Sequence, residues 1–323
     1  MPTHSTPLVS VVIPAYNHEA YVQQTIRSII AQTYANIELL VLNDGSKDAT
    51  FEKINEMKEE CQRRFAITWF HSHANRGTCA TLNALLEQAK GKYVYLIASD
   101  DLAKPQAIQC LLDIMEADDQ CVLAVGDNEY IDNLGNRVFK NSNSELVYED
   151  SEAKYRTFAA QISNNNVDRL LTDFFGNYGN LLQGNHVPNG YLMRKEALGA
   201  TGGYSAEAPL EDYYMALQLA KRGKMHFVSE VLFSYRQHDA NTASRKEHMK
   251  AMWRKTLYHE AKIVDSSDSS YIKQLFNEYL QSRNYLFSLK PLLAMYRICN
   301  CLHSGLYLEV FGKRLKLYGR NKI

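Results

Sequence analysis

The sequence lacks a long apolar run, a signal-like leader and a zinc-binding arrangement of cysteines. Although 46% of the 323 residues are hydrophobic, no apolar run reaches the roughly 18 residues that a membrane-spanning helix needs. Residues 1–7 have neither the basic nor the apolar region of a secretory signal. The six cysteines predict reduced thiols and a cytoplasmic protein. They are Cys61, Cys79, Cys110, Cys121, Cys299 and Cys301.

A net charge of zero conceals a basic C-terminal segment. Residues 283–323 contain eight Lys or Arg and one acid, Glu309, and apolar and aromatic residues are interleaved with them. Such a pattern predicts contact with an anionic membrane surface, as on the inner face of a cell membrane. The alternative is a helix pair that forms a homodimer. We expect no nucleic-acid partner.

Alternating strand and helix patterns predict an α/β fold with a doubly wound, mostly parallel sheet. Strands are predicted at residues 8–13, 37–42, 65–70, 93–98, 121–125 and 225–235, with an extended segment at 190–197. Helices are predicted at 18–34, 48–64, 78–88, 105–117 and 210–221. Residues 140–180 are polar and weakly patterned, and helical patterns dominate from about residue 243. These boundaries predict one domain in two halves, 1–118 and 119–242, followed by a helical basic region, 243–323.

Acidic motifs follow two of the predicted strands. Asn43-Asp44-Gly45 ends one strand, and Ser99-Asp100-Asp101 ends another. Ligands of open α/β sheets bind at the carboxyl ends of the strands. Asp44 is either a turn residue or a carboxylate that accepts a hydrogen bond from a uracil or thymine ring. Pro14-Ala15-Tyr16 would lie beside it, and Tyr16 would stack on the base.

Asp100 and Asp101 predict a metal site. Two adjacent buried carboxylates repel each other unless a cation compensates them, and Mg²⁺ or Mn²⁺ bridging two phosphates supplies that charge. The structural alternative is a cap for the helix near Pro105. His238 is either a surface residue or a group that completes the metal shell or contacts the diphosphate. Arg76, near a helix start, is either solvated or bound to phosphate.

Glu211 and Asp212 open a predicted helix and follow a glycine turn, Gly202-Gly203-Tyr204. They either compensate the helix dipole or act in catalysis. In the catalytic interpretation, one carboxylate accepts the proton of an acceptor hydroxyl and the other orients the substrate, while the glycine turn approaches the acceptor. Residues 185–190 are expected beneath the acceptor, with no assigned roles.

The sequence resembles family-2 glycosyltransferases with the GT-A fold, of the bacterial surface-polysaccharide type. The resemblance is closest in residues 9–50 and 73–101 and returns at 202–204, 210–223 and 235–241. It implies an inverting transferase that uses a nucleotide-sugar donor, with UDP-sugars favoured, and Mn²⁺ or Mg²⁺. A glycan acceptor, expected to be a lipid-linked saccharide, suits cell-surface polysaccharide (O-antigen or capsule) assembly.

Individual residues carry this resemblance. Asp44 matches the base-binding aspartate, and Asp100 matches the metal-ligating last residue of the family's Asp-x-Asp element. Asp212, beside Glu211, matches the general base, and His238 matches a histidine near the metal or diphosphate. One departure is Ala98, which replaces the first acid of Asp-x-Asp, a common ribose contact. Ser99 is the candidate substitute for that contact.

Three alternatives compete with an active transferase. A sugar-nucleotide nucleotidyltransferase would carry a glycine-rich loop after the first strand, where this chain has Pro14-Ala15-Tyr16-Asn17. A glycoside hydrolase needs two carboxylates but no nucleotide pocket. A catalytically inactive GT-A scaffold is compatible with Ala98, but Asp44, Asp100, Asp212 and His238 are all retained.

Overall fold

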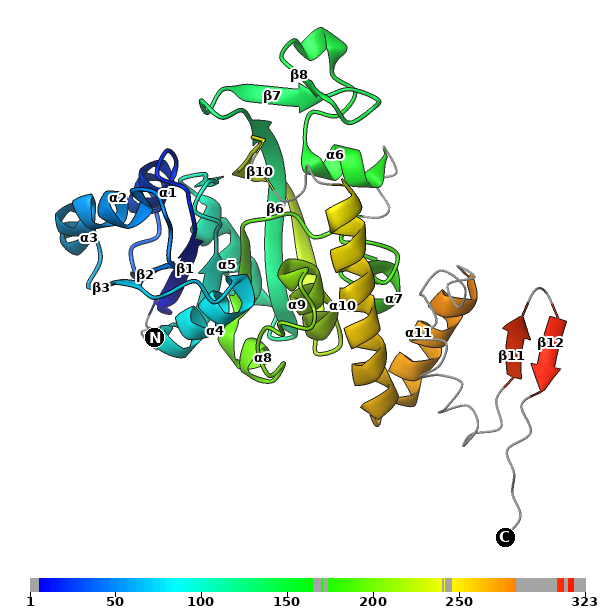
Figure 1. Cartoon of the computed structure of the whole chain (residues 1–323). Helices are drawn as coiled ribbons and strands as arrows, with labels where there is room; N and C mark the ends of the chain where they lie inside the picture. The colour runs from blue at the N-terminus through cyan, green and yellow to red at the C-terminus, as the bar shows by residue number, and fades with distance from the viewer. Residues whose placement is uncertain are drawn as a thin grey trace. The chain divides into compact units, whose positions relative to one another are not determined.

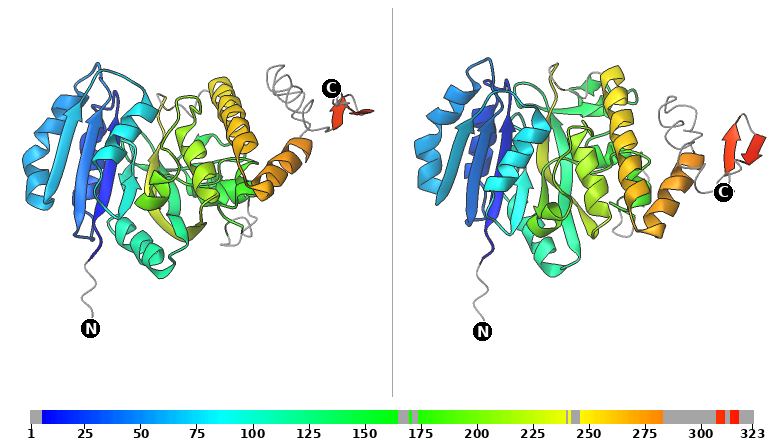
Figure 2. Two further views of the ribbon diagram at one scale, coloured as in Figure 1. Left: turned by 90° about the horizontal axis from the view of Figure 1, so that it is seen from below. Right: turned by 60° about the horizontal axis from the view of Figure 1, so that its bottom comes forward.

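Short, β-branched apolar runs form the first strands of one sheet. The computed structural model (Figures 1 and 2) describes residues 6–164, 170, 174–239, 241, 246–282, 307–310 and 313–316. Its first four long strands are β1 (Val9–Ala15), β2 (Ile37–Asn43), β3 (Ile67–Ser72) and β4 (Tyr93–Leu96). Every position of β2 is buried, as expected for a parallel strand covered on both faces.

The sheet order places late strands beside early ones. The order is β3-β2-β1-β4-β9-β6-β10-β5, and β7 and β8 extend it from β6. Strands β3, β2, β1 and β4 are parallel. Strand β9 (Tyr191–Arg194) runs antiparallel to both β4 and β6 (Cys121–Ile131). Strand β10 (Lys224–Arg236) is parallel to β6 and antiparallel to β5 (Leu102–Ala103). The remaining strands are β7 (Arg137–Lys140) and β8 (Leu146–Val147).

Helices flank the sheet on both faces (Figure 2). They are α1 (Val22–Ile30), α2 (Thr50–Glu56), α3 (Lys58–Arg64), α4 (Thr78–Gln88), α5 (Ala107–Ala117), α6 (Phe158–Ser163), α7 (Tyr178–Leu181), α8 (Lys195–Gly199) and α9 (Glu211–Ala220). A 3-10 turn, η1, covers Asp150–Glu152. The central core combines β1, β2 and β4 with the apolar faces of α1 and α5. The predicted α/β class and mostly parallel sheet are confirmed.

The chain divides into two compact units, residues 1–253 and 254–323. The boundary falls inside α10 (Lys246–Ser266), and the second unit also contains α11 (Ser270–Ser282). In this second unit, β11 (Tyr307–Val310) pairs with β12 (Lys313–Lys316) as a hairpin. The helical pattern predicted to dominate residues 243–323 is present in α10 and α11, whereas these eight residues form strands instead. The rest of the basic segment lies outside the described residues.

Two predicted helices differ from the observed ones. The helix predicted from residue 18 begins only at Val22. Asn17 has a φ of 53°, and the backbone N–H groups of Tyr21 and Val22 both bond to His18 O, so the regular helix starts after this turn. The helix predicted at 48–64 is divided at Met57. There the Met57 N–H bonds Ile54 O, three residues back, which tightens the turn.

Strand β6 is longer than predicted and continues to Ile131. Within the weakly patterned stretch 140–180, the described residues form β8, η1, α6 and α7.

None of the helices in the described part of the chain has the length and apolar character needed to cross a bilayer. Four of the cysteines are free thiols: Cys61, Cys79, Cys110 and Cys121. Cys299 and Cys301 lie outside the described residues.

Candidate active site

A cleft of about 650 Å³ opens at the carboxyl ends of β1, β2 and β4. This volume is in the usual range for a small-molecule site. Most of the residues predicted to act in function line it: Pro14, Ala15, Tyr16, Asp44, Ser99, Asp100, Asp101, Glu211, Asp212 and His238. Arg76 and the turn Gly202-Gly203-Tyr204 are not among its lining residues. The cleft also receives Met249 and Met252 from the start of α10.

Asp44 is a buried carboxylate fixed by the loop that precedes α4. Its oxygens accept hydrogen bonds from the backbone N–H groups of Arg76 (2.8 Å) and Gly77 (3.0 Å). His73 Nδ1 lies 3.5 Å from Asp44 Oδ1. Each oxygen keeps accepting capacity, and the side chain lines the cleft. Asp44 can therefore accept a further hydrogen bond from a ligand there.

Arg76 lies just before α4, near a helix start as predicted, but outside the lining of the cleft. Its side chain is exposed, and helix α4 begins two residues later, at Thr78. The contribution of Arg76 that the structure describes is the backbone N–H that holds Asp44. Phosphate binding by its guanidinium remains a prediction.

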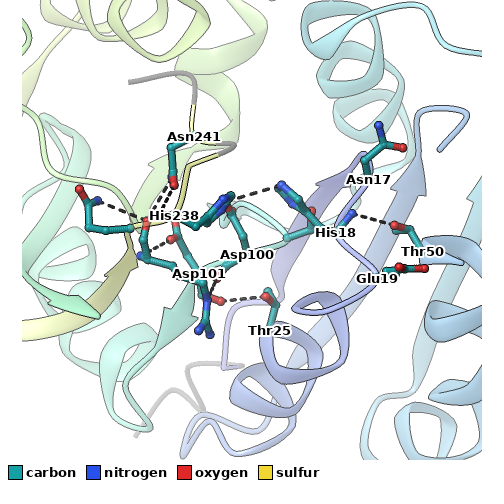
Figure 3. Close-up of polar contacts among 12 residues, drawn as sticks. Asn17, His18, Glu19, Thr25, Thr50, Asp100, Asp101, His238 and Asn241 are labelled. Carbon is teal, nitrogen blue, oxygen red and sulfur yellow. Dashed lines mark hydrogen bonds and ion pairs between the residues drawn. The ribbon is translucent and has the colours of Figure 1, made fainter. Parts of the chain in front are cut away.

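Asp100 lies between two histidines, as Figure 3 shows. His238 Nε2 is 3.0 Å from Asp100 Oδ2, and His18 Nε2 is 3.7 Å from the same oxygen. Burial favours the neutral acid, but the hydrogen bond from His238 and the nearby charge of His18 lower the pKa of Asp100 overall. One ligand atom from each of the three residues lies within 4.8 Å of the others. A carboxylate oxygen and two imidazole nitrogens so close together fit a divalent cation.

Asp101 contacts the end of β10 and is not part of this cluster. Its Oδ1 accepts a hydrogen bond from the backbone N–H of Arg236 (2.8 Å), and it does not belong to the group of possible metal ligands. Burial, together with the charge of Asp100, raises the pKa of Asp101. Asp101 therefore anchors the last residue of β10, and its predicted role as a metal ligand has no geometric support.

Ser99 and Ala98 differ in exposure. Ser99 is buried, and its Oγ is 2.8 Å from His18 Nδ1. Ala98 is exposed and lines the cleft. The Ser99 hydroxyl is thus engaged with His18, which leaves the ribose contact of the missing acid without an evident replacement.

Glu211 and Asp212 form the first turn of α9. Asp212 Oδ2 accepts a hydrogen bond from Asn185 Nδ2 (2.8 Å), and Oδ1 accepts one from the Tyr213 N–H (2.6 Å). Burial raises the pKa of Asp212. Burial and the adjacent Asp212 charge raise the pKa of Glu211 to about 7. A buried pair of carboxyl groups with raised pKa values suits proton transfer.

The glycine turn is a structural support in this conformation. Gly202 and Gly203 have φ values of 81° and 86°, which favour glycine. The Asn83 side chain accepts from the Tyr204 N–H (2.8 Å) and donates to Tyr204 O (2.8 Å). The Tyr204 ring is buried. The turn thus fixes the segment before α9, and its predicted contact with an acceptor stays a prediction.

Three residues of the site were not predicted from the sequence as functional. His18 was assigned to a helix, Asn185 was given no role, and Arg236 was covered only by the segment 235–241 of the family resemblance. His18 follows the left-handed Asn17, and Asn185 lies in the loop 185–190. Neither segment has a periodic pattern of apolar residues, because its conformation depends on contacts with residues distant in the sequence. The sequence signal available for His18 was its place three residues after the end of the first strand, at the edge of the sheet where ligands bind.

Comparison with known proteins agrees with this geometry. Residues 10–175, just over half of the chain, match the model of glycosyl transferase family 2. An uncharacterized glycosyltransferase of Haemophilus influenzae is 34% identical over 132 residues, which are 41% of this chain and 51% of the relative. A chondroitin synthase of Pasteurella multocida is 37% identical over 114 residues, which are 35% of this chain and 11% of that protein.

The length covered differs between relatives. An uncharacterized glycosyltransferase of Rickettsia typhi is 26% identical over 301 residues, which are 90% of this chain and 85% of the relative. In two Haemophilus relatives and one from Rickettsia felis, by contrast, the chain spans 51%, 36% and 41% of the relative's length.

Solved structures share the fold at low identity. The mannosyltransferase PcManGT of Pyrobaculum calidifontis, in complex with GDP-Man and Mn²⁺, has a TM-score of 0.60 and 16% identity, covering 94% of this chain and 77% of that chain. S. aureus TarS 1-349 in complex with UDP-GlcNAc has a TM-score of 0.58 and 15% identity, covering 98% of both chains. The family match, the sheet order and the cleft agree: this chain belongs to glycosyl transferase family 2.

Proposed function

We propose that this chain is an inverting glycosyltransferase that moves a sugar from a nucleotide-diphosphate donor to a hydroxyl group of a glycan. One observation carries the proposal: Asp44, Asp100, His238 and Asp212 line the same cleft. These residues are what such a transfer requires, namely a contact for the base, a cation site for the diphosphate and a general base. An inactive scaffold would have no need to retain all of them.

The donor is proposed to be a UDP-sugar. Asp44 has accepting capacity beyond its two backbone donors, and the N3–H of uracil is a suitable further donor. Tyr16, 41% exposed at the cleft, offers a ring face for stacking. Structural neighbours were solved with UDP-GlcNAc and with GDP-Man, so guanosine is the competing base.

A divalent cation fits beside the donor diphosphate. Asp100 and His238 would hold it, because their ligand atoms are 3.0 Å apart at the cleft. A cation bound there stabilises the negative charge that develops on the leaving nucleoside diphosphate.

Asp212 is proposed to act as the general base. The acceptor hydroxyl transfers its proton to a carboxylate oxygen of Asp212 while its oxygen bonds to the anomeric carbon. The bond from that carbon to the phosphate oxygen breaks, and the electron pair leaves with the nucleoside diphosphate. A single in-line displacement inverts the anomeric centre. Asn185 orients Asp212 through the hydrogen bond to Oδ2.

The acceptor is proposed to be a lipid-linked saccharide of a cell-surface polysaccharide pathway. The basic, aromatic-rich segment 283–323 suits an anionic membrane surface. One relative is named a chondroitin synthase, although the match covers 11% of it. Cytoplasmic placement and the choice between membrane contact and a second subunit stay predictions of the sequence.

Calorimetry with UDP, dTDP and GDP, with and without Mn²⁺, tests the donor site. We expect Mn²⁺-dependent binding of UDP that is lost in Asp100→Ala and weakened in Asp44→Asn. Asp113→Asn, on an exposed face of α5, is the matched control and should bind as the wild type. The lack of binding of any nucleotide at millimolar concentration by the folded protein would falsify the donor assignment.

Turnover separates an enzyme from a scaffold. With a panel of UDP-sugars and glycan acceptors, we expect UDP release that depends on Asp212, and NMR should show an inverted anomeric configuration in the product. Nucleotide binding without turnover on any acceptor would favour the inactive scaffold, and retention of configuration would exclude the one-step mechanism.

A further inference from the structure

His18 enters the cleft from an unusually well-fixed turn. Asn17, just before it, has a φ of 53°, a left-handed conformation that non-glycine residues rarely adopt. The turn 17–19 lies against the loop 46–50 that follows β2. This arrangement places the His18 imidazole beside Asp100, as Figure 3 shows.

Reciprocal hydrogen bonds hold the turn. The Asn17 N–H donates to Ser46 Oγ (2.9 Å), and the Lys47 N–H donates back to Asn17 Oδ1 (2.9 Å). The His18 N–H donates to Thr50 Oγ1 (2.8 Å).

Glu19 completes this network. Its N–H donates to Asp48 Oδ2 (3.2 Å), and the Ala49 N–H donates to Glu19 Oε2 (2.8 Å). Each residue of the turn 17–19 is therefore bonded to the facing loop through its backbone N–H. A backbone fixed in this way suits a side chain that must hold one position.

The His18 ring is also oriented. Nδ1 contacts Ser99 Oγ at 2.8 Å, while Nε2 points to Asp100 Oδ2 at 3.7 Å. The ring of Tyr21 packs edge-on against His18 at 6.0 Å and stacks on His238 at 5.0 Å. When Nδ1–H donates to Ser99, Nε2 presents a lone pair toward the carboxylate. Metal-bound histidines commonly have such a partner on the second nitrogen.

We propose that His18 is a third protein ligand of the divalent cation, oriented by Ser99. The cation site then consists of two imidazoles and one carboxylate: His18, Asp100 and His238. It binds Mn²⁺ or Co²⁺ before the nucleotide arrives, and in preference to Mg²⁺. The inference rests on the proposed function only in assigning the cation to the donor diphosphate.

The preference follows from ligand chemistry. Mg²⁺ retains several waters and is usually held by one or two carboxylates together with substrate phosphates. Imidazole is a better ligand for transition metals, and affinity rises from Mn²⁺ to Co²⁺. Three protein ligands also give the cation a site that does not depend on phosphate oxygens. A site with Asp100 and His238 alone would rely more heavily on the nucleotide.

Binding of Mn²⁺ to the nucleotide-free protein tests this inference. The decisive variant is His18→Asn, whose amide can keep the Ser99 contact while the atom that faces Asp100 is removed. His18→Ala is the second variant, and His71→Asn, at an exposed histidine of β3, is the matched control. Continuous-wave EPR measures free Mn²⁺, and pulsed EPR detects the nitrogen nuclei that ligate the bound ion.

The expected result is a clear loss of affinity. His18→Asn should weaken Mn²⁺ binding by at least about tenfold and remove one of the two ligating-nitrogen signals. The affinity for Mg²⁺, measured by its competition with Mn²⁺, should change little. Ser99→Ala should weaken Mn²⁺ binding by up to about tenfold but keep both signals, since it acts only through ring orientation. His71→Asn should match the wild type.

Two results would overturn the inference. One is wild-type Mn²⁺ affinity and nitrogen signals in both His18 variants, with binding lost in Asp100→Asn. The other is no Mn²⁺ binding by the wild type without nucleotide. Neither bears on the transferase assignment, which is decided separately by UDP binding in the presence of Mn²⁺ and by sugar transfer.

Discussion

Glu211 and Asp212 are adjacent in sequence but have different surroundings. Asp212 accepts hydrogen bonds from Asn185 and from the Tyr213 N–H. Burial raises the pKa of both carboxyls, and that of Glu211 reaches about 7. The two groups titrate as a pair, so at neutral pH they can hold one proton between them.

The pH dependence of catalysis follows from this pair. A general base must be ionised, and burial raises the pKa of Asp212, so kcat/KM should begin to fall with decreasing pH at a pH above the usual range of an aspartate. Glu211→Gln removes the neighbouring charge and should shift this acidic limb to lower pH. Asp212→Asn should lower kcat by about 10²–10⁴-fold at every pH. An acidic limb at the same pH in Glu211→Gln would show that the pair does not control it.

Stability should depend on pH through Glu211 as well. A carboxyl group with a pKa raised from 4.5 to about 7 stabilises the fold below its unfolded pKa, and this contribution is lost as the pH rises through about 7. Glu211→Gln should therefore raise the free energy of unfolding at pH ~8 by up to about 3 kcal/mol and change it little at pH ~4. Urea unfolding at the two pH values measures the difference.

At the scale of elements, the turn 17–19 and the loop 46–50 are the parts that position His18. Their hydrogen bonds link residues about 30 positions apart in the chain. The left-handed Asn17 combines a strained backbone with a side chain that accepts from the Lys47 N–H. These two contributions can be separated by substitution.

A pair of variants at Asn17 separates them. Asn17→Gly removes the side-chain hydrogen bond but tolerates the φ of 53°, so it should lower the free energy of unfolding by about 1 kcal/mol. Asn17→Ala loses the same bond and adds backbone strain, for a total of about 2–3 kcal/mol. Chemical denaturation compares the two. Equal losses would mean that the left-handed conformation contributes no strain.

Element patterns were predictable where they are local. Helix 78–88 was predicted with its observed boundaries, because its ends carry their own signals. The start of α1 could not be predicted from periodicity, because it depends on the left-handed Asn17. The break at Met57 could not be predicted either, because it depends on the hydrogen bond from the Met57 N–H to Ile54 O. Asp100 and His238 were predicted as a site, whereas Asn185 was found only through its contact with Asp212.

At the scale of the first unit, Arg236 links four segments. Its side chain is fully buried and donates to Asp100 O (2.6 Å), Asp132 O (3.1 Å), Asn133 O (3.2 Å) and Gln24 Oε1 (2.9 Å). The guanidinium also lies 4.9 Å from the centre of the Tyr21 ring, which stacks on His238. Arg236 thus joins β10, the loop after β4 that carries Asp100, the turn after β6 and α1.

Loss of this guanidinium should destabilise the unit strongly. Arg236→Met leaves several buried carbonyl oxygens without their donor, and should lower the free energy of unfolding by about 3–5 kcal/mol. Arg236→Lys should recover little of the lost free energy of unfolding, because a single ammonium group cannot reach all of these partners. Arg137→Met, at a side chain that is 51% exposed, is the control. A small loss in Arg236→Met, measured by urea unfolding, would contradict this role.

The sheet order has a consequence for how the protein matures on the ribosome. Strands β1 to β4, with Asp44 and Asp100, are synthesised first and can pair among themselves. Strand β10, which carries Arg236 and leads to His238, is synthesised late, yet it inserts between β6 and β5. Until then Asp101 lacks the Arg236 N–H and Asp100 lacks His238. If Asp100 and His238 together hold the proposed cation, the nascent chain completes that site only when β10 has entered the sheet.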